Sequence, residues 1–118
     1  MKRIVYFVCL LLFGVNYILA QSVVIDGIEY TRSGANTADC RVAKNLSKSV
    51  TSLDILAQVN INRVSCDVTR IEDEGFKGCQ YLYEITIPES VGRIGKKAFE
   101  GCAKLRTLVV PNSVKYIG

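Results

Sequence analysis

Histidine is absent from the 118-residue chain, and no two cysteines have the C-x-x-C spacing. Zinc fingers need clustered cysteine and histidine ligands, and a Cys–His nucleophile needs an imidazole base, so the sequence argues against both. The G-x-S-x-G, P-loop and G-x-G-x-x-G motifs are missing as well, which removes the usual signatures of nucleophilic and nucleotide-dependent enzymes. We therefore predict a non-enzymatic protein without a metal or cofactor.

The chain also has only a small excess of one charge over the other. The chain has 15 basic and 11 acidic residues, a formal net charge of +4. Lys2 and Arg3 lie in a segment that we expect to be removed, which lowers the net charge of the remainder to about +2. This charge is too small and too evenly scattered to indicate a nucleic-acid or anionic-membrane partner.

Residues 1–20 have the composition of a signal peptide. Lys2 and Arg3 form a positive start, Ile4 to Leu12 are all apolar, and Ala20 is a small residue at the expected cleavage position before Gln21. The alternative is an uncleaved anchor, because residues 4–20 carry no charge. That span is at the short limit for a membrane-crossing helix, and Gly14 and Asn16 interrupt it. Either interpretation places the bulk of the chain outside the cytoplasm, and cleavage leaves no membrane span.

An internal repeat is the strongest signal in the chain. Val68-Thr-Arg-Ile71 aligns with Val91-Gly-Arg-Ile94 and then with Val114-Lys-Tyr-Ile117, at an offset of 23 residues each time. The same offset relates Phe76 to Phe99, Cys79 to Cys102 and Pro88 to Pro111. A fixed period of this length is typical of solenoids.

Each unit predicts one coil of such a solenoid. The spacing of Leu82, Ile85 and Ile87 predicts a short strand with its apolar side chains facing inward, and Pro88 then ends the strand. Val91 and Ile94 suit a second turn or a short extended segment, and residues 97–102 predict a short helical turn that stops near Gly101. Strands of successive units are expected to pair in parallel, about 4.8 Å apart.

A lone 23-residue unit cannot bury enough apolar surface to fold, so the units must stack. We expect residues 68–118 to form this array and residues 21–67 to form an N-terminal β cap with an irregular first repeat. Alternating apolar residues predict strands in the cap, and turns are expected at Asp26-Gly27 and Ser33-Gly34. The sequence stops where another helical turn is due, so we expect a fragment of a longer array.

The repeat pattern is I-x-x-x-A-F-x-G-C-x-x-L-x-x-L-x-[IV]-P-x-S-V-x-x-I-G, and Ile94 to Gly118 follow it closely. This pattern resembles the BspA-like class of leucine-rich repeats, from Val68 to the end of the chain. Gly75 departs from it, because the pattern usually has Ala there. Upstream, Val24 to Tyr30 resemble the β-hairpin opening of such domains, and Asp54 to Asn62 resemble an irregular first repeat in which Leu56 replaces the usual Pro.

The resemblance implies a mostly β leucine-rich-repeat solenoid with short helical turns behind its cap. It also implies a secreted or cell-surface protein that binds a protein or cell-surface ligand, and it implies no catalytic residues. The alternative role is a structural spacer or assembly region of a larger surface protein. An exported enzyme is the third and least supported class.

Two pairs of cysteines remain after the signal peptide. Cys79 and Cys102 hold equivalent places in successive units, where repeat symmetry keeps their Cβ vectors parallel, so we expect buried free thiols there. Cys40 and Cys66 lie in the irregular region and form the candidate disulfide of an oxidising compartment. The alternative is that both stay reduced.

The candidate partner-binding face follows from strand alternation. On the two predicted strands the side chains that point away from the core, together with two flanking residues, are Tyr83, Glu84, Thr86, Arg106, Thr107 and Val109. The alternative is that they are ordinary solvent-facing positions. The acidic run Glu72-Asp73-Glu74 suits a solvated turn, and Asn45-Leu46-Ser47 is a glycosylation sequon whose meaning depends on a eukaryotic source.

Overall fold

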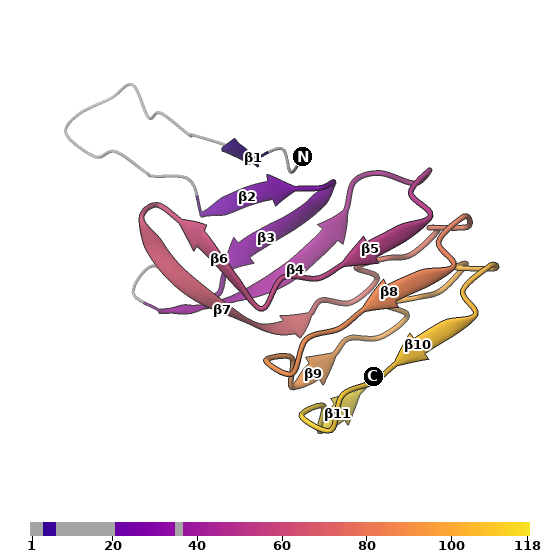
Figure 1. Ribbon diagram of the computed structural model, residues 1–118. Helices are drawn as coiled ribbons and strands as arrows, with labels where there is room; N and C mark the ends of the chain where they lie inside the picture. Colours follow the sequence, from indigo (N-terminus) through magenta and orange to yellow (C-terminus); the bar gives the residue numbers. More distant parts are fainter. Residues whose placement is uncertain (1–3, 7–20, 35–36) are drawn as a thin grey trace.

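The computed structural model describes residues 4–6, 21–34 and 37–118. Within these ranges the chain forms strands and turns without a helix, and hence without a helix that could cross a bilayer (Figure 1). The strands are β1 (Ile4–Tyr6), β2 (Ser22–Ile25), β3 (Ile28–Arg32), β4 (Asp39–Asn45), β5 (Ser52–Asp54), β6 (Gln58–Ile61), β7 (Val64–Ile71), β8 (Glu84–Thr86), β9 (Arg93–Ile94), β10 (Thr107–Val109) and β11 (Tyr116–Ile117). Apart from β1, the predicted signal peptide lies outside the described residues.

The first strands form an antiparallel sheet at the N-terminal end. Asp26 and Gly27 join β2 to β3 as predicted, and both have positive φ angles, 52° and 81°. Two successive positive φ values are the mark of the tight hairpin turns that match strand twist. β4 pairs antiparallel with the other edge of β3, and β1 pairs with the outer edge of β2. The β2–β3 pairing therefore does not depend on β1.

β4 is the strand at which the pairing in the sheet changes from antiparallel to parallel. Its second edge pairs in parallel with β7, with Cys40 opposite Val68 and Arg41 opposite Arg70. Thr69 is the extra residue in this register shift, and its hydroxyl donates to the Cys40 carbonyl at 3.3 Å. β4 thus joins the antiparallel strands to the coiled part of the chain, which the sequence did not predict.

Two parallel stacks of strands run along the coils (Figure 1). One is β5–β8–β10, and the other continues from β4 through β7, β9 and β11. Ile71, Ile94 and Ile117 occupy one register position of the second stack at the predicted 23-residue spacing. The predicted solenoid with parallel strands is therefore confirmed. The strand expected around Ile85 is shorter than predicted, because the Leu82 N–H is bonded within a turn, to the Cys79 carbonyl at 3.1 Å.

The expected helical turns are single turns closed by bonds to the third preceding residue. Cys79 N–H donates to the Phe76 carbonyl and Cys102 N–H to the Phe99 carbonyl, each at 3.2 Å. Gly101, the predicted stop, has a φ of 78°, a left-handed conformation that glycine adopts without a steric penalty. Alternate groups of the two turns bond between coils instead: the N–H groups of Glu74, Phe76 and Gly78 donate to the carbonyls of Lys96, Ala98 and Glu100.

Apolar side chains from both stacks and from the N-terminal sheet form one continuous core. Phe76 and Phe99 stack with parallel rings, with 5.5 Å between their centroids, so the 23-residue spacing also aligns the aromatic rings. Burial falls at the last strands: Ile85 is 3% exposed and its equivalent Leu108 is 38% exposed. The difference arises because β8 has a paired strand on each side, whereas β10 has one.

Candidate partner-binding face

The outward side of β5–β8–β10, here called the front face, collects the predicted strand residues. The register aligns Ser52, Glu84 and Thr107 in one column, and Asp54, Thr86 and Val109 in the next. All six side chains are exposed. Glu84, Thr86, Thr107 and Val109 therefore lie together as the alternation predicted.

The inward residues of the same strands explain this orientation. Leu53 and Ile85 point into the core and are at most 5% exposed. Because side chains alternate along a strand, burying these residues turns their neighbours toward solvent. Ser52 and Asp54 were not predicted from the sequence, because β5 does not follow the 23-residue spacing of the repeat. The alternation around Leu53 was the signal that could have found them.

Tyr83 and Arg106 flank the strands, also as predicted. Arg106 N–H donates to the Tyr83 carbonyl at 3.2 Å, which aligns these two residues across neighbouring coils. With Ala103 and Lys104 they line an open hollow of about 440 Å³. The side chain of Tyr83 is 48% exposed, so an aromatic ring and basic groups are accessible together at one edge of the front face.

A second hollow of about 190 Å³ lies over the strands themselves. Its polar lining includes Glu84, Thr86, Glu89 and Thr107, and Val109 and Pro111 add apolar surface. Val109 is 70% exposed. The face therefore combines acidic and apolar groups over β8 and β10 with basic groups at their N-terminal ends.

The charged groups of the front face form no ion pair with another described residue. Among the described residues, the ion pairs involve none of Asp54, Glu84, Glu89, Lys104 or Arg106. Lys104 instead lies 5.4 Å from the centre of the Tyr81 ring. Charges that are exposed and unpaired within the chain are free to pair with a partner.

Cys40 and Cys66 lie on neighbouring parallel strands, β4 and β7, as buried free thiols. The Cys40 sulfur is 4.0 Å from the Cys66 carbonyl oxygen. Burial, with a smaller contribution from Cys66, raises the pKa of the Cys40 thiol to about 12. Burial also raises the pKa of the Cys66 thiol. Both groups are therefore protonated and weakly nucleophilic at neutral pH. The disulfide between them stays a prediction from the sequence.

Cys79 and Cys102 are free thiols in successive coils; Cys79 is buried, as expected, whereas Cys102 is half-buried. The Cys102 thiol donates to the Phe76 carbonyl at 3.2 Å, and the Cys79 sulfur accepts from the Asn45 amide at 3.3 Å. Burial raises the pKa of Cys102. In the part of the chain that the structure describes, no three cysteine or carboxylate side chains are grouped to hold a metal ion.

The other two motifs singled out from the sequence have structural partners. Glu72 pairs with Arg41 and Arg70, and Glu74 pairs with Lys77 at 3.1 Å. Asn45 of the sequon is 2% exposed, and its amide nitrogen donates to the Ser47 carbonyl. The folded chain therefore does not present this asparagine for glycosylation.

Known proteins share this architecture. The family model described as BspA type leucine-rich repeat region, in six copies, matches residues 45–118. A leucine-rich repeat protein from Bacteroides ovatus is 34% identical, with a TM-score of 0.69, over 78% of this chain and 24% of its own. The chain thus spans about a quarter of that relative's length. No curated protein matches.

Two further solved structures share the fold. The leucine-rich repeat protein of T. pallidum is 24% identical, with a TM-score of 0.66, over 77% of this chain and 40% of its own. A leucine-rich cell surface protein from Faecalibacterium prausnitzii is 18% identical, with a TM-score of 0.54, over 81% and 32% of the two chains. The matched repeat region and the 34% identical relative, together with the coils described above, place the chain in the BspA-type leucine-rich repeat family.

Proposed function

We propose that the chain is an exported binding module whose front face holds a protein or cell-surface partner. The observation that carries this proposal is the pair of in-register columns on β5, β8 and β10, whose charged side chains have no ion pair within the described chain. Sheet faces of repeat proteins form extended binding surfaces, and the family is generally involved in protein interaction. We assign the face no catalytic role.

Export is the second part of the proposal. It rests on the positive start, apolar run and small cleavage residue of residues 1–20. A relative with the same fold is a cell surface protein, which agrees with an extracellular location. The mature chain is expected to begin at Gln21 when its N-terminus is sequenced after secretion. Retention of residues 1–20 with the membrane fraction would instead identify an uncleaved anchor.

Substitutions on the front face test the binding role. A Tyr83→Ala, Thr86→Lys and Arg106→Glu variant should lose binding to cultured cells and to immobilised extracellular-matrix proteins, because it removes the aromatic contact and reverses a charge. Losing such contacts weakens a typical interface by about tenfold or more. Flow cytometry and surface plasmon resonance measure this loss.

The matched control is a Ser65→Ala and Gln80→Ala variant, since both residues are exposed and lie off the front face. It should bind like the wild type. Equal binding by both variants, or no binding by the wild type to any surface, would reject the front face as the binding site. That result would favour the spacer role, which the regular in-register stacking of β8 and β10 also supports.

A further inference from the structure

A column of cationic side chains crosses the second stack of strands, away from the front face. The register places Arg41 opposite Arg70, Arg70 opposite Arg93, and Arg93 opposite Tyr116. Neighbouring strands are about 4.8 Å apart, and like charges directly opposite each other destabilise a sheet. The column therefore needs compensating groups.

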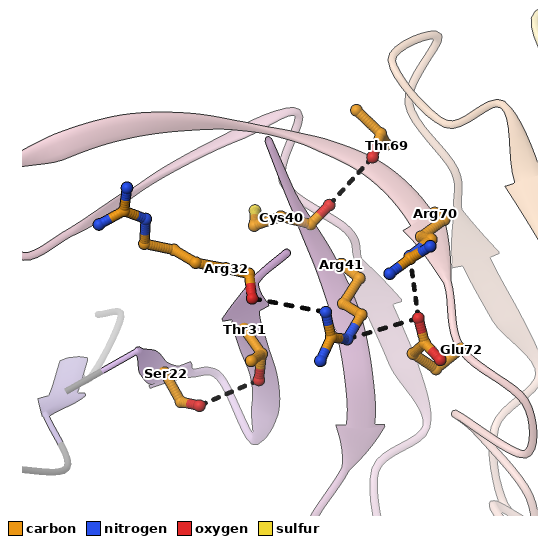
Figure 2. Close-up of polar contacts among 8 residues, drawn as sticks. All are labelled: Ser22, Thr31, Arg32, Cys40, Arg41, Thr69, Arg70 and Glu72. Carbon is orange, nitrogen blue, oxygen red and sulfur yellow. Dashed lines mark hydrogen bonds and ion pairs between the residues drawn. The ribbon is translucent and has the colours of Figure 1, made fainter. Parts of the chain in front are cut away.

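Glu72 compensates the first two arginines. Figure 2 shows the guanidinium groups of Arg41 and Arg70 reaching the same Glu72 oxygen from neighbouring strands, at 3.4 and 2.9 Å. Two positive charges thus share one carboxylate. The Arg41 guanidinium also donates to the Arg32 carbonyl at 3.4 Å, which holds it in place.

Arg93 has no such carboxylate within the part of the chain that the structure describes. Among the described residues its ring contact is with Tyr116, whose centre lies 4.4 Å from the guanidinium carbon, and it takes part in no ion pair. A guanidinium over an aromatic ring keeps its N–H groups available around its edge. Arg93 is exposed, so a cation with unused donors faces solvent in a defined place.

A polar hollow of about 170 Å³ lies against both Arg70 and Arg93. It is lined by Arg70, Ile71, Glu72, Asp73, Arg93 and Gly95. Asp73 is already engaged, because one of its carboxylate oxygens accepts from the Lys96 N–H at 2.8 Å. Gly95 leaves the hollow lined by backbone on that side. The hollow therefore has room for one small planar anion beside Arg93.

We propose that this hollow binds the carboxylate of an acidic side chain from a partner polypeptide, with Arg93 as the bidentate donor and Arg70 beside it. Arginine matches the planar geometry of a carboxylate with two parallel hydrogen bonds. The carboxylates of Glu72 and Asp73 would repel a densely charged polyanion, and the low net positive charge of the chain would attract one only weakly. These features favour an isolated Asp or Glu over a sulfated glycan or a nucleic acid.

The test uses the mature chain and a fluorescein-labelled peptide of alternating Glu and Gly, with the Gln–Gly peptide and heparin as competing probes. Fluorescence anisotropy should show binding of the Glu–Gly peptide that weakens as salt rises. Arg93→Gln should weaken it about tenfold or more, since it removes a charge-assisted hydrogen-bonded pair. The affinity of Arg93→Lys should lie between those of the wild type and Arg93→Gln, because lysine keeps the charge and loses the planar guanidinium.

Arg63→Gln is the matched control. It removes the same charge from an exposed hairpin residue that lies outside the hollow, so its affinity should equal that of the wild type. Equal losses in Arg63→Gln and Arg93→Gln would overturn the proposal in favour of general charge attraction. Heparin binding that depends on Arg93, without binding of the Glu–Gly peptide, would also overturn it. Neither result bears on the front face.

Discussion

At the scale of single residues, Asn45 is a polar side chain buried beside the core, at 2% exposure. Its amide nitrogen donates both to the Ser47 carbonyl and to the Cys79 sulfur. The backbone N–H of Asn45 donates to the Gly75 carbonyl at 2.7 Å. One residue thus connects the end of β4 with the turn and the cysteine column of the following coil.

Replacing Asn45 with Ala should lower the free energy of unfolding by about 1–3 kcal/mol, because a buried side chain and its two hydrogen bonds are lost. Urea denaturation followed by circular dichroism measures the change. Asn112→Ala, at an exposed position, should change the stability by about 0.5 kcal/mol or less. Identical unfolding midpoints for the two variants would show that the Asn45 contacts contribute nothing.

Gly75 shows how a departure from the repeat pattern can have a local cause. The equivalent residue of the next coil is Ala98, which is buried. A Cβ atom on Gly75 would lie 3.1 Å from the Ile71 side chain and 3.2 Å from the Glu72 carbonyl oxygen. Both distances are tighter than ordinary van der Waals contact. An alanine at position 75 would therefore crowd Ile71 of β7 and the Glu72 backbone, so the packing of this turn favours glycine.

At the scale of elements, Gly95 marks the closest approach between successive coils. A Cβ atom there would lie 2.4 Å from the Asp73 nitrogen and 2.5 Å from its carboxylate. Gly95→Ala should therefore lower the free energy of unfolding by at least about 2 kcal/mol, since the backbone must shift to relieve the overlap. Thermal unfolding monitored by calorimetry measures this loss.

Gly78→Ala is the comparison variant. Gly78 has a φ of 78°, and a Cβ atom on it would have open space around it, with no atom beyond its chain neighbours within 4 Å. This substitution should lower the free energy of unfolding by about 1 kcal/mol, because only the unfavourable backbone conformation contributes. A larger loss in Gly78→Ala than in Gly95→Ala would contradict the close approach between coils at Gly95.

The repeat made some elements predictable and left others unpredictable. β8 and β10 could be placed because the 23-residue offset fixes their partners, and with them Glu84, Thr86, Thr107 and Val109. β5 could not, because the β6–β7 hairpin lengthens the first coil and shifts it out of that offset. The parallel pairing of β4 with β7 joins segments without a shared sequence pattern. The arginine column was not predicted, and Arg41 lies outside the 23-residue offset that relates Arg70 to Arg93.

At the scale of the whole molecule, position in the stack decides how much each apolar residue contributes. Ile85 and Leu108 are equivalent in the repeat, yet they are 3% and 38% exposed. In a solenoid each coil contacts its neighbours alone, so stability is close to a sum over coils and the surfaces between them. A coil with two neighbours gains from two such surfaces.

Ile85→Ala should therefore lower the free energy of unfolding by about 2–5 kcal/mol, as expected for a fully buried aliphatic side chain. Leu108→Ala should cost less than half as much, because part of its surface is already in contact with water. Chemical denaturation of both variants of the same chain measures the ratio. Equal costs at the two positions would show that burial in the stack does not govern the contribution of a residue.

The in-register pairing of β8 with β10 also has a consequence for the length of the array. Thr107 replaces Glu84, and Val109 replaces Thr86, at the same points of the hydrogen-bonded ladder. Adding or deleting one whole repeat unit would leave the remaining strand pairings unchanged. The number of coils, and with it the length of the front face, can therefore change in steps of one unit. An insertion within a coil is also accommodated where it forms a hairpin of its own, as β6 and β7 do between the in-register strands β5 and β8.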